Sequence, residues 1–286
     1  MLGTGEAGRR GIARVTMQRI GVFDSGMGGL TVLKALTRAL PGASFVYLGD
    51  TARLPYGTKS ANTVEHYALQ AARALRRHNV DLIVIACNTA SAVALDPLMT
   101  SLAPLPVVGV VGPGAEAGIA ATRNRHIAVI ATESTVRGGA YSRAIHAAAP
   151  DVRVTQAACP LFVALAEEGW TTGTVATAAA ERYLEPIFNV PAHERPDTLV
   201  LGCTHFPALR DVIKGVTGDA VTIVDSAETT ARRVRTLLPP AEDSSADAPQ
   251  FLVTDSPERF ARVGSIFLDR TIAPESVELV DLSFGS

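Results

Sequence analysis

Residues 81–87 read DLIVIAC and residues 197–203 read DTLVLGC, and this pair of segments decides the fold. Asp, Val and Cys recur at the same offsets, and the remaining positions exchange similar apolar residues. Each segment is a short apolar run of the kind that forms a buried strand, and each ends on a cysteine. A pattern that returns at a distance is typical of a duplicated structural unit. The chain is therefore expected to contain two similar halves.

The similarity extends backwards from both cysteines. Each segment follows a helical stretch, which follows a strand with a loop, which follows an opening strand. The matched pairs are 63–79 with 174–189, 44–57 with 152–169, and 20–26 with 127–134. Strands separated by helices predict an α/β fold with parallel sheets, arranged here as two pseudo-symmetric three-layer domains. Since such halves bind ligands between their carboxyl strand ends, Cys87 and Cys203 are expected to approach one cleft from opposite sides.

The same alternation suggests the domain boundaries. Residues 1–19 lack the pattern and are expected to form a disordered N-terminal extension. Residues 20–112 together with 225–286 are expected to form the first α/β domain, and residues 113–224 the second. The tail, with a polar loop at 238–250 and a final strand at 275–282, is expected to return to the first domain.

Composition narrows the function classes. The chain has 286 residues, 47% of them hydrophobic, with a formal net charge of −2 and three cysteines. This charge provides no basic field for nucleic acid or for an anionic membrane. The cysteines are too few and too widely spaced for a disulfide framework, which favours reduced thiols in a cytoplasmic protein. Proline and glycine interrupt the most apolar window, 103–121, so a membrane span is not expected.

The cysteines have two interpretations. A free cysteine is commonly a small buried apolar residue. Cys87 and Cys203, however, follow matching strands, precede polar groups, and are expected to precede helix starts whose amides favour a thiolate. We interpret Cys159, in AACPLF, as a packing residue because it lacks this pattern.

Cofactor motifs are missing from the sequence. The loop FDSGMGGL (23–30) follows a strand and enters a helix, so it either cradles an anion or makes a tight turn. It fits neither a phosphate-binding nor a dinucleotide-binding glycine pattern. None of the lysines, Lys34, Lys59 and Lys214, ends a strand, which disfavours a pyridoxal Schiff base. Neither a cofactor nor a metal is expected.

Five motifs together resemble one enzyme family. GVFDSGMGGLTV, LGDTARLPYGTKS, ACNTAS, CPLFVALAEEG and LGCTHFPAL are similar, in order and spacing, to segments of the cofactor-independent glutamate racemases. The resemblance runs from about residue 20 to the C-terminus. It implies an isomerase that interconverts L-glutamate and D-glutamate, supplies D-glutamate for peptidoglycan, and forms a homodimer. A second role in binding DNA gyrase is left open by family analogy alone.

The resemblance also implies roles for individual residues. Cys87 and Cys203 match the two catalytic thiols, with Cys87 acting on D-glutamate and Cys203 on L-glutamate. Asp24, Glu167 and His205 match the groups that assist these thiols. The positions that match substrate-binding residues are Asp24, Ser25, Pro55, Tyr56, Gly57, Asn88, Thr89, Thr204 and His205. Racemisation needs a base on one face of Cα and an acid on the other, which two facing thiols provide.

Two alternatives remain at this stage. A racemase of a related substrate, such as aspartate or a hydantoin, would keep both thiols and change the side-chain pocket. A non-catalytic amino-acid-binding module would have a similar cleft, but binding alone needs no thiol.

Overall fold

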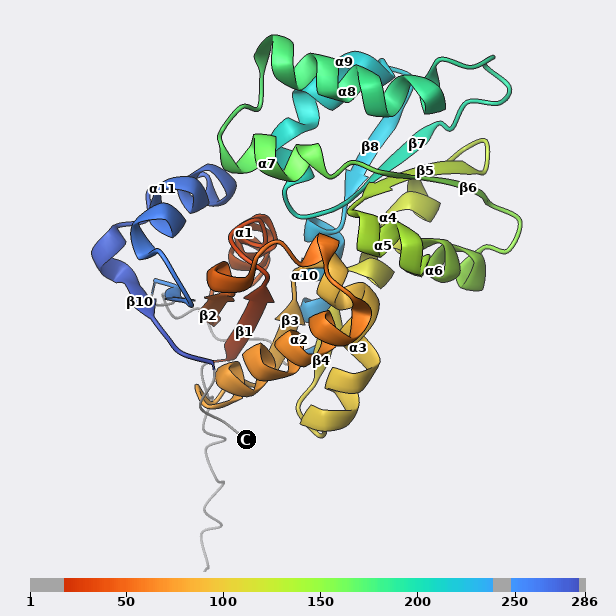
Figure 1. Cartoon of the computed structure of the whole chain (residues 1–286). Helices are drawn as coiled ribbons and strands as arrows, with labels where there is room; N and C mark the ends of the chain where they lie inside the picture. Colours follow the sequence, from red (N-terminus) through yellow and green to blue (C-terminus); the bar gives the residue numbers. More distant parts are fainter. Residues whose placement is uncertain (1–17, 239–247, 283–286) are drawn as a thin grey trace, which may run out of the picture.

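The computed structural model describes residues 18–238 and 248–282, which contain two parallel sheets (Figure 1). The first sheet has the order β10-β9-β2-β1-β3-β4, and the second has the order β6-β5-β7-β8. The first sheet comprises β1 (Arg19–Asp24), β2 (Ser44–Gly49), β3 (Leu82–Ile85), β4 (Val107–Gly109), β9 (Gln250–Val253) and β10 (Val277–Leu279). The second comprises β5 (His126–Ala131), β6 (Arg153–Ala158), β7 (Thr198–Gly202) and β8 (Thr222–Asp225).

The predicted repeat is present in the topology. The order β2-β1-β3-β4 of the first sheet returns as β6-β5-β7-β8 in the second, so β3 and β7, the strands before the two cysteines, are equivalent. The α/β fold class with two parallel-sheet halves is confirmed. In each half the chain steps from the opening strand to one neighbour and then crosses to the other side. This reversal of strand order leaves a crevice at the carboxyl strand ends, where ligands bind in such sheets.

Helices surround both sheets, as Figure 1 shows. Those of the first half are α1 (Leu30–Ala39), α2 (Ala61–Arg76), α3 (Asn88–Leu102), α10 (Ala227–Leu237) and α11 (Pro257–Leu268). Those of the second half are α4 (Val111–Ala121), α5 (Glu133–Gly138), α6 (Ala140–Ala148), α7 (Leu161–Glu167), α8 (Gly173–Phe188) and α9 (Arg210–Thr217). Short 3-10 helices are η1 (Thr51–Arg53), η2 (Tyr56–Thr58), η3 (Phe206–Leu209) and η4 (Pro274–Ser276).

Helix α2 illustrates how sequence sets an element. Ser60 caps its start, because the Ser60 hydroxyl accepts a hydrogen bond from the Thr63 N–H at 3.3 Å. Its buried residues, Val64, Ala68, Ala71, Ala72 and Leu75, recur at helical spacing and lie on one face. That face packs against the first sheet. Burial of this stripe, more than helix propensity, stabilises the helix.

The two halves share apolar packing. One continuous cluster of buried side chains includes Leu30 and Phe267 of the first half and Phe162, Leu199 and Phe206 of the second. Across the boundary, the His205 ring of the second half meets the Phe267 ring of the first edge to face, with centroids 5.2 Å apart. The halves are therefore in direct contact beside the carboxyl end of β7.

Some boundaries differ from the sequence expectations. The first strand begins at Arg19, and residues 1–17 of the expected extension lie outside the described residues. Strand β9 was not predicted, because its first residue, Gln250, belongs to the polar segment expected to be a loop and only three apolar residues follow it. The final strand is shorter than expected, since η4 occupies its first part. Both β9 and β10 join the first sheet, as expected for the tail.

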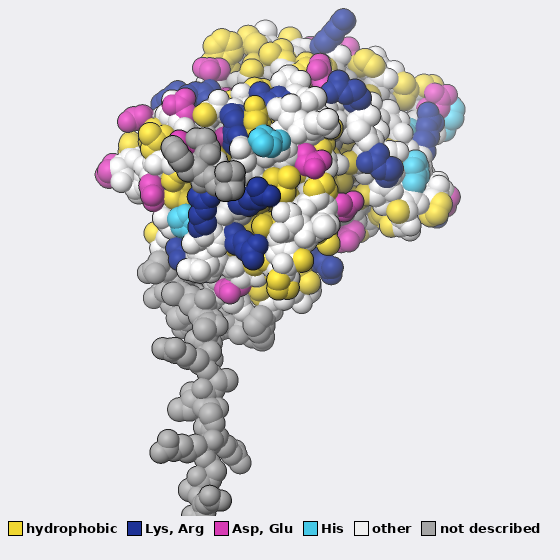
Figure 2. All heavy atoms as spheres, turned by 60° about the horizontal axis from the view of Figure 1, so that its bottom comes forward, with side chains coloured by type: hydrophobic (Ala, Val, Ile, Leu, Met, Phe, Trp, Pro, Cys, Tyr) yellow, Lys and Arg dark blue, Asp and Glu magenta, His cyan; other side chains and the backbone are white. Residues whose placement is uncertain are grey.

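Helix length and surface charge indicate whether the described residues have the features that a membrane or a charged partner would require. Within residues 18–238 and 248–282, no helix combines the length and apolar character that crossing a membrane requires. On the face drawn in Figure 2, basic side chains lie among acidic, apolar and uncharged ones.

Candidate active site

The candidate site lies where the carboxyl ends of β1, β3 and β7 meet. Asp24 ends β1 and Ser25 follows it, Cys87 lies shortly after β3, and Cys203 follows β7 directly. The two halves touch here, because the hydroxyl of Thr31, in the first turn of α1, donates to the Thr204 carbonyl at 3.4 Å. Parallel strands that end at these edges thus bring both thiols of the repeat to one place.

Cys87 occupies the N-cap of α3. Its Sγ accepts a hydrogen bond from the Ala90 N–H at 3.5 Å, and its thiol donates to the Ser25 hydroxyl oxygen at 3.4 Å. Burial, followed by the nearby charge of Asp24, raises the pKa of the Cys87 thiol to about 12, although the Ser25 and Ala90 hydrogen bonds oppose this. Without a ligand, Cys87 is therefore a neutral thiol at pH 7.

Cys203 has a different environment. Its Sγ lies 3.8 Å from His205 Nδ1, and His205 Nε2 lies 3.1 Å from Glu167 Oε1. Burial lowers the pKa of His205, but the hydrogen bonds and charges of Cys203 and Glu167 outweigh it and raise this pKa to about 10. An imidazole with this pKa carries a proton at pH 7. The two cysteines thus have different neighbours: a hydroxyl and a helix N–H at Cys87, and a protonated imidazole at Cys203.

The sequence expectation for Cys203 needs correction. Both cysteines were expected to precede a helix start whose amides would favour a thiolate. Cys87 does so, but Cys203 is followed by a turn and the 3-10 helix η3, and α9 begins only at Arg210. The His205 imidazole, rather than a helix N-terminus, provides the positive partner of Cys203.

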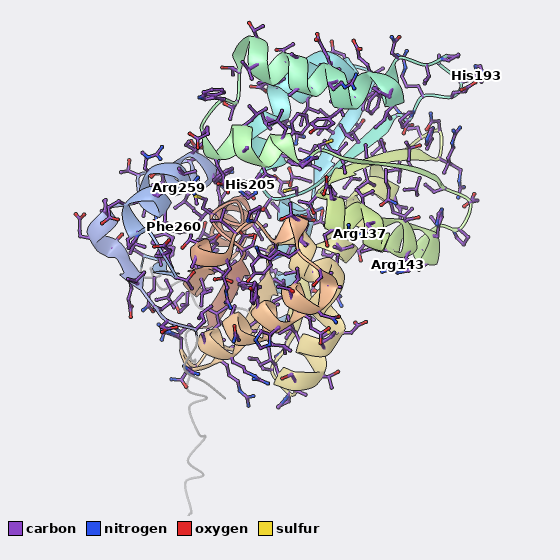
Figure 3. All side chains as sticks on the ribbon, in the orientation of Figure 1. Arg137, Arg143, His193, His205, Arg259 and Phe260 are labelled. Carbon is purple, nitrogen blue, oxygen red and sulfur yellow. The ribbon has the colours of Figure 1, made fainter. Side chains whose placement is uncertain are left out.

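Glu167 connects His205 to a residue that sequence reasoning missed. Glu167 Oε2 accepts a hydrogen bond from Arg259 Nη2 of α11 at 2.9 Å. Burial raises the pKa of Glu167, but the hydrogen bonds and charges of His205 and Arg259 lower it below its ordinary value. Figure 3 shows Arg259 on α11 close to His205. No sequence signal marked Arg259, because α11 lies far along the chain from Glu167 and His205.

Asp24 and Asn88 each have one buried side-chain atom without a hydrogen-bond partner. Asp24 Oδ2 accepts from the Gly26 N–H at 3.0 Å, and Asn88 Oδ1 accepts from the Tyr141 hydroxyl at 2.6 Å. Asp24 Oδ1 and Asn88 Nδ2 are buried and have no protein partner within the described part of the chain. Burial raises the pKa of Asp24. Buried polar atoms are nearly always paired, so the two unpartnered atoms, on residues that adjoin Ser25 and Cys87 in the sequence, favour a polar ligand.

Thr89 joins the halves through hydroxyl groups. Thr89 Oγ1 lies 2.9 Å from Thr132 Oγ1 and 3.4 Å from Thr135 Oγ1, and both partners belong to the second half. Sequence reasoning identified Thr89 but missed the partners. The repeat contained a signal for Thr132, because it aligns with Ser25, the residue that contacts Cys87.

The Pro55-Tyr56-Gly57 segment approaches the same contact. A Cβ placed on Gly57 would lie 2.6 Å from Thr132 Cβ, so this loop touches the second half. The Tyr56 hydroxyl donates to the Asp50 carboxylate, and its ring is buried. The side chain of Tyr56 is thus engaged with Asp50, whereas its N–H lies at the start of η2, where helix N–H groups lack an internal partner.

Two further expectations concern thiols and metals. All three cysteines are free and buried, and Cys159 packs within the core cluster, where burial raises its pKa to about 12. Within the two described ranges, no group of three or more His, Cys, Asp or Glu side chains is arranged to hold a metal ion.

Several known proteins with a similar sequence or structure are racemases. The Asp/Glu/Hydantoin racemase family model matches residues 20–234. A glutamate racemase of Geobacter metallireducens is 49% identical over 87% of this chain and 92% of its own length. One from Koribacter versatilis is 44% identical over 92% of this chain and 97% of its own. The crystal structure of the Francisella tularensis glutamate racemase in complex with D-glutamate superposes with a TM-score of 0.84 at 34% identity, covering 93% of this chain and 98% of that one. With the family model matching far more than half of its residues, this chain belongs to the Asp/Glu/Hydantoin racemase family.

Proposed function

We propose that this protein is a glutamate racemase that interconverts L-glutamate and D-glutamate without a cofactor. One observation carries the proposal: two thiols from equivalent positions of a repeat lie beside a buried unpaired acceptor and a buried unpaired donor. The relatives with high identity are glutamate racemases, which favours glutamate over aspartate or a hydantoin. Two thiols with distinct proton-handling partners argue against a module that only binds an amino acid.

The proposed reaction uses one cysteine as the base and the other as the acid. Cys203, acting as a thiolate beside the His205 imidazole, removes the Cα proton of L-glutamate, so that the Cα–H bond breaks and an S–H bond forms. The electron pair left on Cα then takes the proton of the Cys87 thiol from the opposite face. D-glutamate results, and Cys87 becomes the thiolate that starts the reverse reaction. Return of the enzyme to its starting state requires proton exchange with solvent.

The substrate's own charges fit the unpaired atoms. Asp24 Oδ1 can accept a hydrogen bond from the ammonium, and Asn88 Nδ2 can donate one to the α-carboxylate. Ser25 and Thr204 hydroxyls lie in the adjoining loops. Donors fixed around the α-carboxylate stabilise the negative charge that develops when the proton leaves Cα. The first N–H groups of η2 and the Thr89 hydroxyl are candidates for the side-chain carboxylate.

The site must open to admit this substrate. Cys87 and Cys203 are 5% and 6% exposed, and Asp24 is fully buried. We propose that the two halves part for substrate entry and product release and close for proton transfer, which excludes water from the carbanion. We propose that the two moving bodies are the domains 20–112 with 225–286 and 113–224, whose boundaries fall near the start of α4 and the end of β8.

The assembly and location are further proposals. Trp170 and Val175, in the α7–α8 region, are 57% and 53% exposed, and such apolar side chains favour an interface between two copies of the chain. A Trp170→Ser variant should then be lighter than the wild-type dimer in light scattering; a wild-type monomer would contradict the proposal. Three free cysteines favour the cytoplasm, where D-glutamate would supply peptidoglycan synthesis.

Optical rotation provides the direct test of activity. The purified protein, incubated with pure D-glutamate, should carry the rotation to zero, while D-aspartate under the same conditions should change far more slowly. Equal rates on both substrates would contradict the assignment to glutamate. An unchanged rotation with both would contradict a racemase of either amino acid.

A further inference from the structure

Helix α11 of the first half contacts the proton-handling groups of the second half. Arg259 forms its ion pair with Glu167, and the Phe267 ring meets the His205 ring edge to face with centroids 5.2 Å apart. Arg259 and Phe267 are eight residues apart, so they lie on one face of the helix. The same helix is anchored in the first half, where Gly264 packs against Leu30 of α1. Figure 3 shows Arg259, on α11, beside His205.

The Arg259–Glu167 pair differs from ordinary surface ion pairs. The Glu167 side chain is only 9% exposed, and its two oxygens have separate partners, Oε1 with His205 and Oε2 with Arg259. A carboxylate held at both oxygens has little freedom to rotate away from His205. Because Arg259 belongs to the first half and Glu167 to the second, the pair also spans the boundary between the halves.

We propose that Arg259 is a positioning residue: from the opposite half of the molecule, it holds the Glu167 carboxylate against His205 and thereby keeps His205 protonated beside Cys203. Arg259 itself contacts neither thiol. The inference rests on the proposed racemase function for its kinetic consequences but not for its structural ones. It also implies that the series of contacts from Arg259 through Glu167 and His205 to Cys203 forms only while the two halves are in contact.

Few charged groups of the described residues lie near the series of contacts from Arg259 through Glu167 and His205 to Cys203. His205 faces Cys203 and Glu167 from the second half and Asp24 from the first. Glu167 faces His205 and Arg259, with Asp24 at longer range. Among residues 18–238 and 248–282, Arg259 is therefore the cation that the first half places against Glu167, and removing it leaves Oε2 without that partner.

The first test measures His205 directly and needs no substrate. In protein labelled with 15N-histidine, the His205 signals are assigned by their loss in His205→Gln, and their titration is followed by NMR. Arg259→Met should lower the pH at which His205 titrates by about one unit, a tenfold change in its ionisation constant. Arg262→Met, at an exposed arginine of the same helix, is the matched control and should titrate as the wild type does.

A second variant separates charge from length and guards against a folding defect. Arg259→Lys keeps the positive charge but replaces the planar guanidinium by an ammonium, which orients a carboxylate less well. The pH at which His205 titrates should therefore lie between the values for the wild type and for Arg259→Met. If Arg259→Met does not fold, this variant alone carries the test. Wild-type titration of His205 in every folded Arg259 variant would overturn the proposal.

Kinetics provide the second readout. In Arg259→Met, kcat for glutamate should fall by about tenfold, and the acidic limb of the pH profile should move to higher pH, because Glu167 loses a cation that lowers its pKa. Arg259→Lys should restore the limb, and Arg262→Met should not alter it. A loss of kcat with an unmoved limb would mean that Arg259 only supports the fold and would overturn the proposal. If wild-type protein does not racemise glutamate, the proposed function fails, yet the NMR result still decides the role of Arg259.

Discussion

Replacing Gly28 by alanine would add one methyl group at the contact between the two halves. A Cβ at this position would lie 2.6 Å from His205 Nδ1 and 2.6 Å from Thr204 Oγ1. Ordinary non-bonded contacts begin near about 3.5 Å, so His205, Thr204 or the whole loop must retreat by roughly 0.9 Å. Gly28 is not among the glycines with positive φ, so alanine does not strain the backbone itself. The perturbation therefore falls on the site.

The size of the effect follows from this displacement. A misplacement of about 1 Å in a catalytic group can cost about 100-fold in rate. We therefore expect kcat/KM of Gly28→Ala to fall by about 100-fold, equivalent to about 2.7 kcal/mol of transition-state stabilisation. L-glutamate and D-glutamate have equal free energies, so kcat/KM must fall equally in both directions.

Initial rates of rotation change with each enantiomer measure this loss. The matched control is Gly112→Ala, because Gly112 is exposed in α4 and no atom lies within 4 Å of its added Cβ. This control should keep wild-type kcat/KM. A Gly28→Ala enzyme with wild-type kcat/KM would refute the close packing of the first loop against His205, and with it the site geometry.

Two other predictions follow from individual hydrogen bonds. Tyr56→Phe removes the donor to the buried Asp50 carboxylate, so urea unfolding should show a loss of about 2 kcal/mol, while kcat/KM stays within about twofold; a large loss of activity would mean that the Tyr56 hydroxyl serves the substrate. His205 has a pKa of about 10 in the folded chain against an ordinary 6.5, so its charged form stabilises the fold fully below pH 6.5 and this contribution disappears as the pH rises to about 10. The gap in unfolding midpoint between wild type and His205→Gln should shrink over that range, and a widening gap would contradict the ion pair with Glu167.

The repeat explains how much of this arrangement the sequence could predict. Matching apolar runs before Cys87 and Cys203 were enough to identify β3 and β7 as equivalent strands of the two halves, because buried parallel strands have a strong local signal. Strand β9 was not predicted, since three apolar residues at the end of a polar segment have no measurable periodicity. Its pairing with β2 depends on the folded sheet rather than on its own sequence.

The site residues, too, differ in how far the sequence could predict them. Residues next to a strand end, such as Asp24 and Cys87, could be located from the pattern. The resemblance to a family placed Glu167 and His205. Arg259 could not be found in either way, because its contact with Glu167 arises only when α11 packs beside α7. The prediction of a helix start at Cys203 was wrong, because Pro207 and its neighbours form a 3-10 turn before α9 begins.

In the proposed mechanism, Cys87 and Cys203 transfer protons on opposite faces of Cα. The most direct measurement is the position of deuterium when wild-type enzyme acts on each enantiomer of glutamate in heavy water, followed by NMR of the Cα proton at early times. Two separate thiols predict that the product carries deuterium at Cα while the recovered substrate keeps its proton, and that Cys87→Ala and Cys203→Ala each lose racemisation but retain the fold. Equal deuterium in substrate and product from the first turnovers, or a Cys203→Ala enzyme that still racemises well, would contradict it.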